Sequence, residues 1–114
     1  MNNDIVSLVC EAWRFSRACR DILPKLNHED SVRFGGRCSW FCRRLEEICG
    51  GMGLRIVEII PGTEYDIGMA VTPINIEDFD AGDSLRVVNM IEPVIMTGDT
   101  VIKAGTVILE RAEE

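Results

Sequence analysis

Apolar residues in the first half of the chain recur at alternating steps of three and four, the spacing of an amphipathic helix with one packed seam. The first seam consists of Ile5, Leu8, Ala12, Phe15, Cys19, Ile22 and Leu26. After a polar connection over 26–31 the same rhythm resumes with Phe34, Cys38, Phe41, Leu45 and Ile48. We therefore predict two helices, with Pro24 ending or kinking the first because proline lacks an amide hydrogen.

The second predicted helix carries signals at both ends. Asp30 or Ser31 is a suitable N-cap, because either side chain can accept from a free backbone amide. Gly50-Gly51 is a strong stop, because glycine readily adopts the left-handed conformation that closes a helix. The early pair Gly35-Gly36 costs about 1 kcal/mol per glycine relative to alanine. Either this helix begins later than the cap suggests, or another stretch of backbone approaches closely at the pair.

Two helices joined by a short turn pack as an antiparallel hairpin. A single hairpin of this size leaves each seam half covered, whereas two hairpins together complete a four-helix bundle. We therefore expect a homodimer. Its interface is expected to contain the seam residues Leu8, Ala12, Phe15, Cys19, Phe34, Cys38, Phe41, Leu45 and Ile48.

From residue 54 onward the pattern changes to short β-rich runs separated by turn residues. Strands are predicted over 54–60, 69–72, 84–90, 93–96, 100–103 and 106–111. Short strands at close spacing indicate a compact β-sandwich or small barrel. The acidic segment 75–80 is expected to form a surface loop. The predicted fold class is α+β: an N-terminal antiparallel helical hairpin over 1–53, used for dimerisation, followed by a small all-β lobe over 54–114, used for partner binding.

Charge is distributed unevenly between the two halves. The chain has 114 residues, of which 46% are hydrophobic and 27% charged, and its net charge is −7. Residues 1–53 hold eight basic and seven acidic residues, a net of +1, whereas 54–114 hold four and twelve, a net of −8. Because an acidic surface repels phosphate backbones, nucleic acid is disfavoured as a partner.

The same chain gives no sign of membrane insertion or export. Its apolar runs are much shorter than the roughly 20 residues that span a bilayer. The start Met1-Asn2-Asn3-Asp4 is polar and acidic and lacks the plan of a secretion signal. We expect a cytoplasmic protein that makes no membrane contact.

All five cysteines lie in the first half: Cys10, Cys19, Cys38, Cys42 and Cys49. An odd number without a signal peptide indicates reduced thiols. Cys38 and Cys42 would share a helix face, which leaves open a thiol-based metal or redox sensor. A zinc site needs about four ligands, however, and His28 is the only histidine. Small buried apolar residues are therefore the plainer interpretation of these cysteines.

The signatures of common enzymes are not found in the sequence. Gly50-Gly51-Met52-Gly53 follows a predicted helix, the wrong order for a phosphate-binding loop. His28 lies in a charged linker with no partner to orient it. We expect no enzymatic activity, no catalytic residues, no cofactor and no bound metal. The hairpin pattern over 92–108 also occurs in lipoyl and biotinyl carrier domains, but those place a modifiable lysine at the hairpin tip, and Lys103 lies within a predicted strand.

The order of elements and three short motifs resemble GrpE, a family of nucleotide exchange factors for DnaK-type chaperones. Met52-Gly53-Leu54 is similar to the family's aromatic-Gly-Val step, where the last bundle helix passes into the first strand. Tyr65-Asp66 and Ala70-Val71 are similar to the ends of its central Phe-Asp-Pro…His-Glu-Ala-Val motif. The run from Ile102 to Leu109 is similar to its terminal strand.

The resemblance implies an obligate dimer whose short helices form a four-helix bundle. Each β lobe would press against the nucleotide-binding domain of the chaperone and open its ADP cleft, without covalent chemistry. The positions that match partner contacts are Gly53 at the lobe junction, Tyr65 and Asp66 in the central motif, and Lys103 and Leu109 near the final strand. Gly53 also suits a helix stop and Leu109 a core position. Lys103, a cation in an acidic lobe, is the better functional candidate.

Two departures from the family leave a second function open. The family's long paired N-terminal stalk helices have no counterpart before Pro24. The central motif is two residues shorter, and Ile67-Gly68-Met69 stands where the family has its histidine and proline. The alternative is a dimeric adaptor of GrpE-like shape that serves a divergent DnaK-like ATPase without exchange activity.

Overall fold

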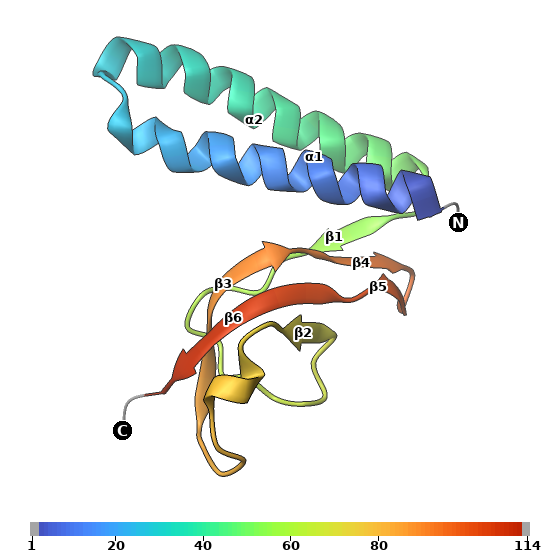
Figure 1. Cartoon of the computed structure of the whole chain (residues 1–114). Helices are drawn as coiled ribbons and strands as arrows, with labels where there is room; N and C mark the ends of the chain where they lie inside the picture. The colour runs from blue at the N-terminus through green and yellow to red at the C-terminus, as the bar shows by residue number, and fades with distance from the viewer. Residues whose placement is uncertain (1–2, 113–114) are drawn as a thin grey trace. The chain divides into compact units, whose positions relative to one another are not determined.

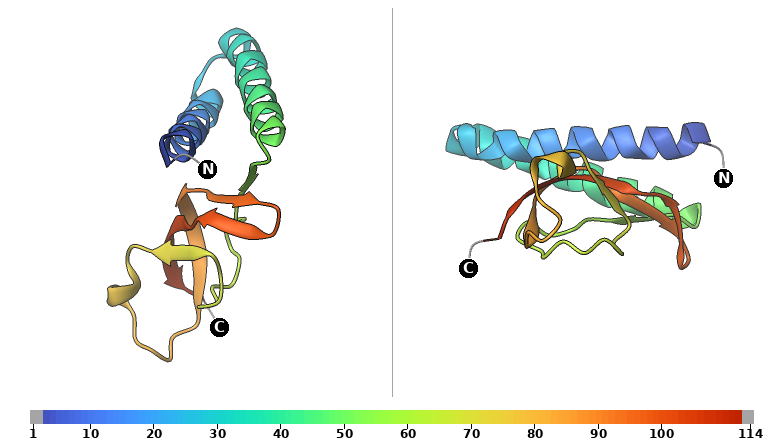
Figure 2. Two further views of the ribbon diagram at one scale, coloured as in Figure 1. Left: turned by 90° about the vertical axis from the view of Figure 1, so that its right-hand side faces the viewer. Right: turned by 60° about the horizontal axis from the view of Figure 1, so that its bottom comes forward.

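The computed structural model describes residues 3–112, and the chain divides between Arg55 and Ile56 into two compact units. The first unit is an antiparallel helical hairpin (Figures 1 and 2). Helix α1 spans Asn3–Ile22, the short 3-10 helix η1 spans Leu23–Lys25, and α2 spans His28–Gly51. The predicted role of Pro24 is confirmed, because the α-helix stops before it and Pro24 lies within η1.

Helix α2 begins earlier than its predicted caps. The N-cap is Asn27, whose side-chain oxygen accepts a hydrogen bond from the Asp30 amide at 2.8 Å. The Asn27 amide group also donates to the Asp30 carboxylate at 3.0 Å. Asp30 and Ser31 therefore lie inside the helix and not at its cap, and the prediction of either as the cap is wrong. In this first turn the negative charge of Asp30 is favourable next to the positive end of the helix dipole.

The glycine pair of α2 fits neither explanation offered by the sequence. Gly35 and Gly36 lie inside a continuous helix. A Cβ at Gly35 would make ordinary contact with Leu23 at 3.8 Å, and one at Gly36 would meet nothing within 4 Å. Nothing in the packing of the hairpin explains either glycine. Helix α2 ends at Gly51, where the stop was predicted, but the left-handed residue is Gly53, with φ of 75°, and not Gly50 or Gly51.

Helix α1 has two apolar stripes rather than one. Its buried residues are Val6, Val9, Cys10, Trp13 and Ser16. By contrast, the predicted seam residues Leu8 and Phe15 are exposed, and Ala12 and Cys19 are only half-buried. The deepest burial on α1 therefore falls on a stripe that the seam prediction did not include. The predicted seam is the more accessible of the two stripes.

The second unit contains six short strands and one 3-10 helix (Figure 1). Their bounds are β1 Arg55–Val57, β2 Val71–Pro73, η2 Ile76–Asp78, β3 Leu85–Glu92, β4 Val94–Thr97, β5 Thr100–Lys103 and β6 Gly105–Arg111. Each predicted strand is present, although β1 is shorter than predicted. The fold class α+β, with a helical hairpin before the β elements, is confirmed.

The strands form two three-stranded sheets, ordered β1-β4-β5 and β2-β6-β3. Strands β3 and β6 pair antiparallel over most of their length, and Leu85 lies opposite Arg111. Strand β2 pairs parallel to β6, with Val71 opposite Gly105. A side chain at Gly105 would lie 2.9 Å from Met90 and 3.0 Å from the Glu92 carbonyl oxygen, so only glycine fits there. Neither sheet closes into a barrel.

Alternation of side chains along these strands forms the core of the second unit. The buried apolar residues are Leu85, Val87, Met90, Val94, Ile95, Val107 and Leu109. Most come from β3 and β6, where every second residue is buried over part of each strand. No helix among residues 3–112 is both long enough and apolar enough to cross a membrane.

Candidate functional site

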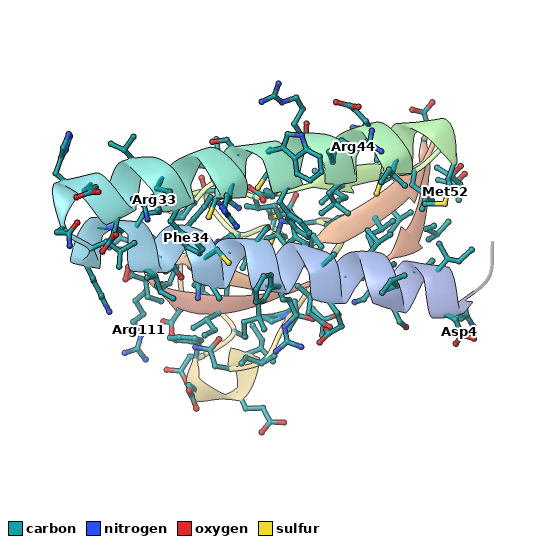
Figure 3. All side chains as sticks on the ribbon, turned by 90° about the horizontal axis from the view of Figure 1, so that it is seen from above. Asp4, Arg33, Phe34, Arg44, Met52 and Arg111 are labelled. Atoms are coloured by element: carbon teal, nitrogen blue, oxygen red, sulfur yellow. The ribbon has the colours of Figure 1, made fainter. Side chains whose placement is uncertain are left out.

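An open apolar groove lies between the two helices of the hairpin. It has a volume of about 530 Å³ and is lined by Phe15, Ser16 and Cys19 of α1 and by Arg33, Phe34, Gly36, Arg37, Cys38, Trp40 and Phe41 of α2. The Phe15 and Phe41 rings meet edge to face, with centroids 6.4 Å apart. Phe34 lies on the side of α2 that faces α1 (Figure 3). The groove is a feature of the first unit alone.

Large apolar side chains at this groove remain open to solvent. Phe15 is 65% exposed and Trp40 is 60% exposed. Aromatic side chains contribute most when fully covered, so their exposure marks a surface suited to a protein partner.

Five of the nine residues predicted for the dimer interface line the groove: Phe15, Cys19, Phe34, Cys38 and Phe41. Of the other four, Leu8 and Ile48 are exposed, while Ala12 and Leu45 are half-buried. Cys38 is the only one of the nine that is buried in the single described chain. The predicted seam is therefore largely accessible in the single chain. Trp40 belongs to the same surface but was not predicted, because it lies one position before the seam residue Phe41.

Charged residues of α2 form short ion pairs within that helix. Arg33 pairs with Glu29 at 3.1 Å and Arg44 with Glu47 at 2.9 Å, and all four side chains are largely exposed. Exposed pairs of this kind contribute roughly 0–1 kcal/mol each. The energetics of the groove therefore depend mainly on its apolar lining.

Two thiols line the groove, Cys19 on α1 and Cys38 on α2, and Cys42 lies one helical turn beyond Cys38. The Cys38 thiol has the Cys19 thiol of α1 and the Cys42 thiol of its own helix as neighbours. Burial, and then the neighbouring Cys19 thiol, raise the pKa of Cys38. Within residues 3–112, no group of three or more His, Cys, Asp or Glu side chains is arranged to hold a metal ion. The sequence indicated the pair Cys38 and Cys42 but could not show that Cys19 approaches from the other helix.

The five predicted partner-binding residues lie in different surroundings. Gly53 follows α2, where its amide donates to the Gly50 carbonyl at 3.0 Å. Its φ of 75° fits its role as a helix stop. Leu109 is buried among the core residues of the second unit, in agreement with a core position.

Tyr65 and Asp66 belong to a turn before β2. The Tyr65 amide donates to the Leu85 carbonyl at 2.9 Å, which attaches this segment to the start of β3. Asp66 is exposed, and its carboxylate accepts from the Gly68 amide at 3.2 Å. Its carbonyl accepts from the Met69 amide at 2.9 Å and closes the turn. The shortened central motif is thus a compact turn.

Lys103 ends β5 and is held by neighbours within its own unit. Its ammonium group lies 3.3 Å from the Glu92 carboxylate and donates to the Ala104 carbonyl at 3.1 Å. The same Glu92 oxygen accepts from the Thr106 hydroxyl at 2.8 Å. The Lys103 side chain remains 26% exposed, so its charge is partly available at the surface.

A second cavity, of about 520 Å³, lies beside Tyr65 in the β unit. Its lining residues are Glu64, Tyr65, Ile67, Ile76, Phe79, Asp80, Ala81, Asp83, Ser84 and Leu85. Ile67 is 90% exposed at its edge. Arg111 lies over the Phe79 ring at 5.7 Å and pairs with Asp83 at 3.1 Å.

The sequence did not predict this cavity. The acidic segment 75–80 was expected to be a solvated loop, but it includes Ile76 and Phe79 among its acids. Apolar residues such as Ile76 and Phe79 in a charged segment were the sequence feature that could have indicated the cavity. The cavity combines carboxylates with apolar surface.

Comparisons with known proteins leave the family of this chain open: no protein-family model, curated protein or solved structure matches it.

Proposed function

We propose that this chain is a GrpE-like cochaperone, a homodimer that binds the nucleotide-binding domain of a DnaK-type ATPase and promotes ADP release. The observation that carries the proposal is the pairing of a helical hairpin that has an open apolar seam with a separate, acidic β unit. In a GrpE-like protein the hairpin is used for dimerisation and the β unit for partner binding. The motif resemblance around Gly53, Tyr65 and Ile102 supports the same assignment.

The hairpin supports the dimer through the spacing and exposure of its seam. Leu8, Phe15 and Ile22 are exposed at intervals of seven residues on α1. Phe34, Phe41 and Ile48 repeat this interval on α2. A seven-residue repeat is the seam pattern of helices that pack against one another in bundles. A second copy of the hairpin has the same two seams, so packing of two copies covers the α1 seam and the α2 seam of each chain.

The β unit supports partner binding through its charge and its surface. Residues 54–114 carry a net charge of −8, which attracts a basic surface on another protein. Lys103 provides a partly exposed cation in this acidic unit, and the Tyr65 cavity provides apolar surface. Complementary charge of this kind speeds encounter and fixes orientation.

Exchange in this proposal requires differential binding and no bond chemistry. A factor that binds the open form of the ATPase more tightly than the closed form shifts the population toward the open form. The size of the shift is limited by the ratio of the two affinities. ADP then dissociates faster because the open cleft holds it less tightly.

Stopped-flow release of fluorescently labelled ADP from a DnaK-type ATPase tests the proposal. The ATPase to use is the DnaK-type ATPase whose gene lies closest to the gene for this chain. Saturating protein should accelerate ADP release, and the Phe41→Ala variant should accelerate it less if the dimer is needed. Binding without any change in the release rate would reject exchange and select the adaptor. Neither binding nor acceleration would reject both functions.

A further inference from the structure

Two thiols on different helices face each other in the hairpin groove. Cys19 on α1 is half-buried, and Cys38 on α2 is buried at 7% exposure. Both line the groove, and the Cys19 thiol is near enough to Cys38 to contribute to the raised pKa of Cys38. Cys42 lies one helical turn beyond Cys38 on the same helix and is half-buried.

The packing on either side of this pair fixes its register. Toward the hairpin turn, Leu23 lies beside Gly35, and a Cβ at Gly35 would be 3.8 Å from Leu23 Cδ2. Toward the other end, the Phe15 ring packs on Phe41 at 6.4 Å. In antiparallel helices a step of four residues back along α1 matches a step of three or four forward along α2. Cys19 lies four residues from both Leu23 and Phe15, and Cys38 lies three residues from both Gly35 and Phe41. The two thiols are therefore one helical turn from each contact and lie opposite each other.

We propose that Cys19 and Cys38 form a reversible disulfide that joins α1 to α2 when the protein meets an oxidising disulfide such as glutathione disulfide. This modification site goes beyond the proposed function. In the proposed dimer a second copy covers Cys19, so glutathione disulfide reaches the pair in the dissociated chain. It also replaces the pair that the sequence suggested. Cys38 and Cys42 are four residues apart on one helix, so their Cβ atoms lie about 5–6 Å apart, farther than the roughly 3.5–4.5 Å that a disulfide requires.

The exchange proceeds in two steps. The thiolate of Cys19, the more accessible of the two, attacks one sulfur of glutathione disulfide, forms a mixed disulfide and releases one glutathione thiolate. The Cys38 thiolate then attacks the Cys19 sulfur and releases the second glutathione. Two protein thiols are oxidised, one glutathione disulfide is reduced to two glutathione molecules, and the two thiol protons pass to the leaving thiolates. The raised pKa of Cys38 fits its use in the second step, because a largely protonated thiol is the poorer first nucleophile.

Mass spectrometry of the full chain after incubation in a glutathione redox buffer tests the proposal. The intact mass should fall by two hydrogen atoms with no glutathione attached, and the number of free thiols in denatured protein should fall by two. Digestion should give a peptide that contains Cys19 joined to one that contains Cys38. Trypsin leaves Cys38 and Cys42 on one peptide, so mapping uses Cys42→Ser, which should still form the disulfide.

Matched variants separate this pair from the other thiols. Cys19→Ser and Cys38→Ser should each abolish the internal disulfide, whereas Cys10→Ser and Cys49→Ser, which replace buried thiols of the same unit, should retain it. The disulfide should raise the thermal midpoint by roughly 5–10 °C, and dithiothreitol should reverse the rise. A stable glutathione adduct on Cys19, a link to any other cysteine, or a disulfide between two chains on non-reducing electrophoresis would overturn the proposal. Chymotrypsin cleaves after Trp40 and Phe41, between Cys38 and Cys42, so chymotryptic mapping of the unmodified chain gives the answer even if a serine variant fails to fold.

Discussion

Lys103, the candidate contact residue of the β unit, is oriented by its neighbours within that unit. Lys103 is paired with Glu92, which also accepts from the Thr106 hydroxyl, so the lysine charge is oriented by its own unit. The sequence identified Lys103 as a cation in an acidic lobe, but the ion pair spans eleven residues and could not be deduced from spacing. A partner must therefore compete with Glu92 or bind the pair as a unit.

Removing the Lys103 charge tests whether it contributes to partner binding. Lys103→Met should lower the free energy of unfolding by no more than about 1 kcal/mol, because the pair is partly exposed. The Kd for the ATPase should rise several-fold, measured by calorimetry. Glu92→Gln is the control, because it removes the same ion pair and keeps the cation. If Lys103→Met binds as tightly as the unmodified protein, Lys103 is not in the interface.

A carboxylate at the edge of the second cavity should make stability sensitive to acid. The Asp80 amide and the Arg111 guanidinium both donate to Asp83, at 2.9 and 3.1 Å, and hold the pKa of its carboxyl below the usual value. A lowered folded-state pKa means that this stabilisation is present above the unfolded-state pKa and is lost as the pH falls through the folded-state value. Urea unfolding at a series of pH values below about 5 should show this loss.

Asp83→Asn is the variant that isolates the effect. It retains a side-chain oxygen but does not titrate, so its free energy of unfolding should change less over the same acid range. Equal pH dependence in the two proteins would show that Asp83 does not contribute to it.

Helices and strands differ in how far the sequence determines them. The strands were predictable because each is a short β-rich run bounded by turn residues. The parallel pairing of β2 with β6 was not, because Val71 and Gly105 are distant in sequence and only tertiary packing selects the partner. In α1 the predicted seam has regular helical spacing, but so do Val6, Val9 and Trp13, which belong to the stripe that is buried. Spacing alone does not decide which of two apolar stripes is buried.

The cap of α2 was predicted wrongly because three suitable capping residues lie close together in the sequence. Asn27, Asp30 and Ser31 are all suitable, and the sequence alone does not decide which amide is left free. Asn27→Ala should lower the free energy of unfolding by about 1 kcal/mol, because the Asp30 amide loses its acceptor. Chemical denaturation measures the loss, and Asn27→Asp should restore most of it. No loss in the alanine variant would show that the cap does not stabilise the folded chain.

Phe41 tests the hairpin as an assembly element. Its ring packs on Phe15 in the groove and is only half-buried in one chain. If a second copy covers it, Phe41→Ala should cost about 3–5 kcal/mol in the assembled state and dissociate the dimer, as seen by light scattering coupled to chromatography. Val32→Ala is the control, because Val32 is 64% exposed on the same helix and is not among the groove-lining residues. Its effect should stay within about 0.5 kcal/mol, and equal effects of both variants would contradict the proposed seam.

At the scale of the whole molecule, charge and exposed apolar surface are divided between two units. The helical half is close to neutral and has the open groove, whereas the β half carries the net −8. The sequence predicted this division of charge and half of the ten residues that line the groove. The Tyr65 cavity and the Cys19–Cys38 pair required the tertiary structure, because each brings together residues from separate elements.

The most direct test of this account is the molar mass of the reduced protein in solution, measured by sedimentation equilibrium over a range of concentrations. We predict twice the chain mass of 12.8 kDa for the unmodified protein and for Val32→Ala, and a shift toward the single-chain mass for Phe41→Ala. A stable single chain at every concentration, with no change in Phe41→Ala, would contradict the paired hairpins and the cochaperone function built on them.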